Sequence, residues 1–125
     1  MPGAMAAIAG HLVLLVITDG TGHSYAVPNL HLLDARTGAT VRTVDFGEWP
    51  QRPWKAQAAL TEDGSFAWIA AEPLSNPPHV VRLARPGADP ITLDSGAPGA
   101  LGALGLSGRT LTWTNGGEAR SYTLP

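Results

Sequence analysis

A thirteen-residue segment occurs twice in this chain, and its recurrence limits the fold more than any other feature. Ala35–Gly47 aligns without gaps with Ala84–Gly96, forty-nine positions further on, and seven aligned residues are identical. Val44 in the first copy is matched by Leu93 in the second. A fixed internal period of this length indicates supersecondary units that each bury an apolar face against the next unit. We therefore expect a fold built from stacked repeats.

The composition narrows the class of protein. A chain of 125 residues, 44% hydrophobic and 14% charged, is expected to form one compact domain and not a disordered chain. A net charge of −2 and a single lysine, Lys55, argue against a nucleic-acid partner, which requires clustered basic side chains. The absence of cysteine excludes disulfides, a thiolate zinc site and a cysteine nucleophile.

The apolar stretch Ala4–Ile17 has two interpretations. It contains fourteen residues, fewer than the roughly 18–20 that a membrane-spanning helix needs. A signal peptide begins with basic residues, whereas no Lys or Arg precedes this stretch. A signal or anchor remains the alternative. The preferred interpretation is two consecutive buried strands joined by a turn at Ala9-Gly10, with no membrane span and no assigned compartment.

Short apolar segments alternate with turn signals along the whole chain. Asp63-Gly64, Ser107-Gly108 and similar pairs are typical of tight hairpin turns, because glycine accepts positive φ. Eleven prolines disfavour long helices, although Ala4–Ala9 and Lys55–Leu60 have helical propensity. The expected strands are Ala4–Ala9, His11–Thr18, Asn29–Asp34 and Thr40–Asp45; Ala56–Leu60, Ser65–Ala71, His79–Ala84 and Asp89–Leu93; then Leu101–Leu106, Arg109–Thr114 and Ala119–Leu124.

The first strand of each set is rich in Ala and Gly, as expected where strands crowd near a shared axis. Leu32–Gly38, Thr61–Trp68 and Leu106–Trp113 resemble blade motifs of bacterial Trp/Asp-like (WD40-like) and quinoprotein-like β-propellers, in which Leu-Asp-x-x-Thr-Gly ends the third strand and Asp-Gly-Arg-x-Leu opens the second. The resemblance covers most of residues 10–125. It implies an all-β fold of antiparallel four-stranded units, a partial β-propeller or a propeller-like open sheet assembly.

The number of units departs from that family. We expect a single domain, 1–125, with units at about 4–46, 55–94 and an incomplete 100–125, whereas a closed propeller needs at least four blades. An open row would leave apolar faces and strand edges uncovered. Self-association, excision from a longer protein, or an open barrel or sandwich would each resolve this.

Long connections are expected at one end of the sheets, where binding residues usually lie. These are Asp19–Pro28, Phe46–Trp54, Glu72–Pro78 and Asp94–Gly99. The candidate residues for binding a ligand or partner are Trp49, Arg52, Trp54, Asp19, His23, Glu72 and Asn76. Trp and Arg dominate interface hot spots, although both loop tryptophans could instead seal the gap between units. Trp68 and Trp113, inside strands, are expected in the core.

No constellation of residues specifies a reaction. The four histidines lack close metal-ligand spacing, so the sequence predicts no catalytic residue, no metal site and no cofactor. Asp45 and Asp94 occupy equivalent repeat positions, which favours capping of the following turn. The leading hypothesis is a non-catalytic protein-binding or self-assembly module, with a homo-oligomer or a protein partner. The alternatives are part of a propeller-type hydrolase or lyase completed by further blades or subunits, and an isolated repeat fragment without independent activity.

Overall fold

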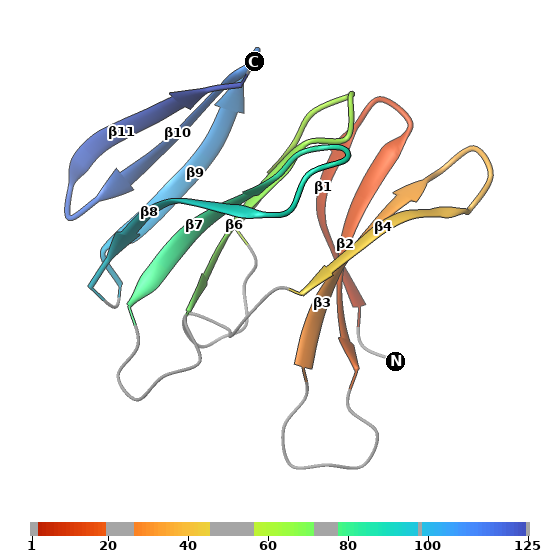
Figure 1. Cartoon of the computed structure of the whole chain (residues 1–125), viewed down its shortest axis with the longest axis horizontal. Helices are drawn as coiled ribbons and strands as arrows, with labels where there is room; N and C mark the ends of the chain where they lie inside the picture. Colours follow the sequence, from red (N-terminus) through yellow and green to blue (C-terminus); the bar gives the residue numbers. More distant parts are fainter. Residues whose placement is uncertain (1–2, 20–26, 46–56, 72–77, 98, 125) are drawn as a thin grey trace.

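The computed structural model describes residues 3–19, 27–45, 57–71, 78–97 and 99–124. These residues form eleven strands in three antiparallel sheets, each with its strands in sequence order (Figure 1). The strands are β1 (Gly3–Ala9), β2 (Leu12–Asp19), β3 (Val27–Asp34) and β4 (Thr40–Asp45); β5 (Ala58–Leu60), β6 (Phe66–Ala71), β7 (His79–Ala84) and β8 (Ile91–Gly96); and β9 (Leu101–Ser107), β10 (Thr110–Asn115) and β11 (Glu118–Thr123). The all-β prediction is confirmed. The described part of the chain holds no helix of the length and apolarity needed to cross a membrane.

The three sheets stack in a row, with β5–β8 between the other two (Figure 1). The middle sheet is therefore covered on both faces, and its strand β6 shows this most clearly. From Phe66 to Ala70 no residue is more than 1% exposed. Successive side chains of a strand point to opposite faces, so a doubly covered strand is apolar without alternation.

One core lies between β1–β4 and β5–β8. Leucines and valines of β2 and β3 meet Phe66 and Trp68, whose ring centroids are 5.7 Å apart. Ala7, Ala9 and Ala58 of the first strands pack at the margin of this core. The first strands β1 and β5 lie against each other, and β5 likewise contacts β9. Small side chains on these strands permit that approach, as their composition predicted.

A second core lies between β5–β8 and β9–β11. It contains Ile69 and Leu83 of the middle sheet together with Leu111, Trp113 and Leu124 of the last unit. Trp68 is fully buried and Trp113 is 4% exposed, so both tryptophans predicted to lie in the core do so.

The two matching segments occupy equivalent places in the fold. Each forms the hairpin between the third and fourth strands of its sheet, β3–β4 or β7–β8. Gly38 and Gly87 both have a φ of 74°, which favours glycine, and Val44 and Leu93 both face the next sheet along the row. The second link is one residue longer, 85–90 against 35–39, so the two hairpins differ in register.

The largest error in a predicted strand boundary is at the end of β8, which was expected at Leu93. β8 continues to Gly96 because His79, Val80 and Val81 of β7 pair with the residues from Asp94 onward. The connection to β9 is accordingly the short stretch 97–100, and not the long Asp94–Gly99 loop. A hydrogen bond from the Ala100 N–H to the Ala97 carbonyl lies within it.

Candidate interaction surface

A row of three sheets leaves two outer faces, one at each end. One is the side of β1–β4 that points away from the middle sheet; we call it the apolar end face. The other is the corresponding side of β9–β11, the threonine-rich end face. Their residues follow from the strand registers and from which side chains enter the two cores.

The apolar end face arises from the continuous apolar run of β2. Leu12, Leu14 and Val16 enter the core, so Val13 and Leu15 between them point outward. The residues beside Val13 and Leu15 on this face follow from the pairing of β2 with β1 and β3, and from the bulge in β4. The apolar end face therefore contains six mostly apolar residues: Ile8, Val13, Leu15, His31, Leu33 and Val41. The pairing of β3 with β4 also places the polar residues Asn29, Thr40, Thr43 and Asp45 on this side of the sheet.

The exposure of these side chains shows that the face is open. Ile8 is 61% exposed and Val41 is 58% exposed, while the other four are half-buried by their own sheet. None of the six belongs to either core. A charged residue on this side is Asp45, at the end of the edge strand β4, and the six residues themselves include no Asp, Glu, Lys or Arg. The sequence predicted a buried strand at this apolar run, but among the described residues only one face of β2 is covered by another sheet.

The threonine-rich end face has the opposite chemistry. In β10, Leu111 and Trp113 enter the core, and the alternate threonines point outward with the paired residues of β11 and β9. This face contains Gly102, Gly105, Ser107, Thr110, Thr112, Thr114, Ala119, Ser121 and Thr123. The Thr114 hydroxyl donates to the Gly102 carbonyl at 3.2 Å. A polar outer face of this kind is what keeps the terminal unit of a repeat stack in water.

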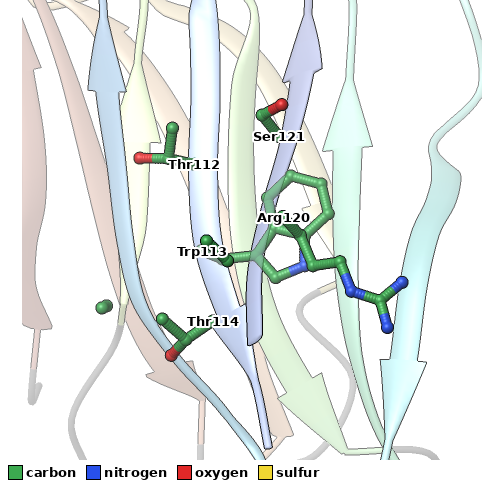
Figure 2. A pocket seen from close by; sticks show the side chains of 7 residues that line it. Thr112, Trp113, Thr114, Arg120 and Ser121 are labelled. Carbon is green, nitrogen blue, oxygen red and sulfur yellow. The ribbon is translucent and has the colours of Figure 1, made fainter. Parts of the chain in front are cut away.

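A shallow hollow of about 370 Å³ lies on the threonine-rich end face (Figure 2). Its lining comes from β9, β10 and β11, and consists of Ala103, Thr112, Trp113, Thr114, Ala119, Arg120 and Ser121. The Arg120 Nε lies 2.9 Å from Oε1 of Glu118, and both side chains are exposed. Ala103 has a φ of 54° at the bulge opposite β10, a backbone conformation that disfavours a side chain.

Asp94 joins the last sheet to the middle one. Its Oδ2 accepts the Trp113 Nε1–H at 2.8 Å and the Asn115 amide N–H at 3.2 Å, and its Oδ1 accepts the Ser95 N–H at 2.9 Å. Burial acts to raise the pKa of Asp94, but these hydrogen bonds outweigh it and hold the pKa below its ordinary value. The predicted local capping is therefore only part of what Asp94 does, because its hydrogen bonds to Trp113 and Asn115 join two different sheets.

Two further contacts tie the hairpins of neighbouring sheets together. The Arg42 guanidinium of β4 donates to the carbonyls of Arg85 and Ala88 in the β7–β8 hairpin at 2.6 and 2.5 Å. Asp63, in the β5–β6 turn, lies 3.1 Å from the Arg109 guanidinium in the β9–β10 turn. The Thr61 hydroxyl and the Ser65 N–H also donate to Asp63, and these hydrogen bonds lower its pKa to about 2. These hydrogen bonds and the ion pair thus join the two outer sheets, which bear the end faces, to the middle sheet.

The residues that the sequence predicted for binding lie almost wholly outside the described structure. Trp49, Arg52, Trp54, His23, Glu72 and Asn76 fall in segments that are not described, and Asp19 ends β2 without a described side chain. Sequence reasoning missed the apolar end face. The alternate positions of β2 were visible as Val13 and Leu15, but nothing in the sequence showed which of the two apolar faces would stay open.

Comparison of the chain with family models, curated proteins and solved structures found no match. Within the described ranges, no group of three or more His, Asp or Glu side chains is placed to hold a metal ion. The candidate surface is therefore defined by its own geometry and chemistry.

Proposed function

We propose that this protein is a non-catalytic module of propeller-like units that binds a protein partner, or further copies of itself, through the apolar end face. One observation carries the proposal. The outward side of β1–β4 carries open apolar side chains along β1–β3, whereas the inward side of the same sheet is buried against Phe66 and Trp68 of the middle sheet. A contiguous apolar surface on a folded domain marks an interaction site.

The contrast between the two ends supports this proposal. A terminal sheet that remains in water is expected to replace apolar side chains by small polar ones, and β9–β11 does so at Thr110, Thr112 and Thr114. The first sheet keeps Val13 and Leu15 at comparable central positions. An apolar end face therefore suggests a surface that is covered in the working state of the protein.

Three of the described carboxylates make structural contacts, which fits a binding role better than a catalytic one. Asp34 is held by Arg36, with its Oδ2 3.0 Å from the guanidinium, and these contacts lower its pKa to about 2. Asp63 and Asp94 are likewise engaged in hydrogen bonds that join turns and sheets. Each acts as a structural anion in a different hairpin.

A site-specific photo-crosslinker tests the proposal. p-Benzoylphenylalanine in place of Val13 samples the apolar end face, and the same group in place of Thr112 samples the threonine-rich end face as a matched control. We expect irradiation to give covalent adducts with a polypeptide, either this chain or another, from position 13 well above those from position 112. Equal or absent adducts from the two positions would rule the proposal out.

A further inference from the structure

We infer that the occupant of the apolar end face is the same face of a second copy, related by a two-fold axis, so that two chains form a closed dimer with their threonine-rich end faces outermost. This inference rests on the proposed function and names its partner.

The chemistry of the two end faces favours this pairing over head-to-tail assembly. In a head-to-tail row, Ile8 and Val41 of one copy would lie against the hydroxyls of Thr112 and Ser121 of the next. Buried hydroxyls that lose water without gaining a hydrogen-bond partner cost free energy, and an apolar face offers them none. Two apolar end faces meet mainly through Ile, Val and Leu side chains, since Thr43 and Asp45 lie on the edge strand β4. An interface between identical patches closes after two copies.

The first core shows what covers a sheet of this kind. The face of β5–β8 with Phe66, Trp68 and Val80 is buried by the leucines and valines of β1–β4, an apolar sheet of the same strand number. The outward face of β1–β4 presents Ile, Val and Leu side chains of the same type. Two copies of one sheet share the same right-handed twist, which lets them pack face to face with their strands nearly aligned.

The size of the face sets the strength of the dimer. β1–β4 has four strands and β2 has eight residues. With strands about 4.8 Å apart and a rise of about 3.3 Å per residue, the face covers about 500 Å² per copy. The total of about 1,000 Å² lies at the lower limit for specific interfaces, so a reversible dimer with a dissociation constant in the micromolar range is expected.

The pair Leu15 and His31 lies on the two inner strands, β2 and β3, and marks the middle of the face. Residues near the two-fold axis of such a dimer approach their own copies in the partner. Because the chain contains no cysteine, one introduced cysteine reports on one position alone. Packed sheets lie about 10 Å apart, which suits a short bismaleimide better than a direct disulfide.

Cross-linking of single-cysteine variants decides the geometry. With His31→Cys we expect efficient cross-linking of two identical chains by the bismaleimide, and with Thr112→Cys we expect none. A mixture of the two variants, one isotopically labelled, should give no product joining position 31 to position 112. That mixed product as the main species would show head-to-tail packing and overturn the inference, while leaving the proposed function intact.

Sedimentation analysis of the unmodified chain from about 1 µM to 1 mM checks the stoichiometry. We expect monomer and dimer with no larger species. Val41→Lys and Leu15→Lys should each weaken association at least tenfold, and Thr112→Lys should leave it unchanged. Val41 is 58% exposed, so its lysine variant is expected to fold, and an unchanged far-ultraviolet circular dichroism spectrum verifies this.

Three sedimentation results also overturn the inference: a monomer throughout the concentration range, species larger than the dimer, or dissociation caused by Thr112→Lys. A monomeric chain whose photo-crosslinker at Val13 labels a different polypeptide refutes the two-fold dimer but supports the proposed function. A monomeric chain without such labelling refutes both.

Discussion

Replacement of Asp94 by alanine measures how strongly one carboxylate holds β9–β11 to the middle sheet. The side chain accepts hydrogen bonds from Trp113 at 2.8 Å and from Asn115 at 3.2 Å, both on β10. Alanine removes the Oδ2 atom that accepts both hydrogen bonds. The Trp113 indole N–H, on a side chain that is only 4% exposed, is then left without its carboxylate partner.

Hydrogen bonds to charged groups contribute about 1.5–3 kcal/mol each when one partner is deleted. Asp94 is half-buried, so water partly replaces the two hydrogen bonds once they are lost. The expected cost of losing both bonds together therefore lies near the lower end of the range for one bond. We expect Asp94→Ala to lower the free energy of unfolding by about 2 kcal/mol. For a domain of 125 residues this corresponds to a fall in Tm of about 8 °C. Asp94→Asn keeps one acceptor oxygen and should cost about half as much.

Urea unfolding followed by far-ultraviolet circular dichroism gives the free energies, and a double-mutant cycle with Trp113→Phe isolates the shared term. A coupling of at least about 1 kcal/mol is expected for two groups in direct contact. Asp89→Ala serves as the control, because Asp89 is an exposed carboxylate in the same hairpin. A coupling within error of zero, or an equal loss for Asp89→Ala, would refute the assignment of Asp94 as the link between the sheets.

Three further predictions use other parts of the scaffold. Ala103→Gly should stabilise the protein by about 0.5–1 kcal/mol in urea unfolding, because φ is 54° there; a loss of stability would contradict that backbone strain. Arg42→Met should destabilise it by about 1–3 kcal/mol by removing both bonds to the Arg85 hairpin, and an unchanged midpoint would show that they add nothing. Burial lowers the pKa of His79 in the folded protein, where its Nδ1 accepts the Gly99 N–H. The stability that neutral His79 contributes is therefore complete above pH 6.5 and is lost as the pH falls through the lowered pKa of the folded state. His79→Gln should remove this pH dependence of the unfolding free energy, measured by urea unfolding at a series of pH values.

The order and approximate bounds of the strands could be predicted from the sequence, because turn signals and apolar segments alternate regularly along it. β4 and β7 have the predicted bounds, and the other strands lie within a few residues of theirs. Hairpins between sequential strands form locally, so Asp63-Gly64 and similar turns specify pairing without long-range information. The predicted end of β8 came too early because Ser95 and Gly96 have no strand propensity of their own. In the structure both residues pair with β7.

The faces of the sheets could not be predicted in the same way. Alternation in β2 shows that Leu14 and Leu15 point in opposite directions, but not which side meets another sheet. Likewise, Asp94 and Trp113 are distant in sequence, and their hydrogen bond depends on how two separate sheets stack. The candidate loop residues, Trp49 and Trp54 among them, lie in a segment outside the described structure. The site predictions that rest on them stay predictions.

The opposite chemistry of the two end faces gives the stack a direction. A duplicated four-stranded unit joined ahead of β1 would meet Ile, Val and Leu side chains and gain burial at once. The same unit joined after β11 would have to dehydrate a row of Thr and Ser hydroxyls before it gained any contact. Lengthening of this architecture by gene duplication, or by design, is therefore favoured at its amino-terminal sheet and opposed at its carboxy-terminal one.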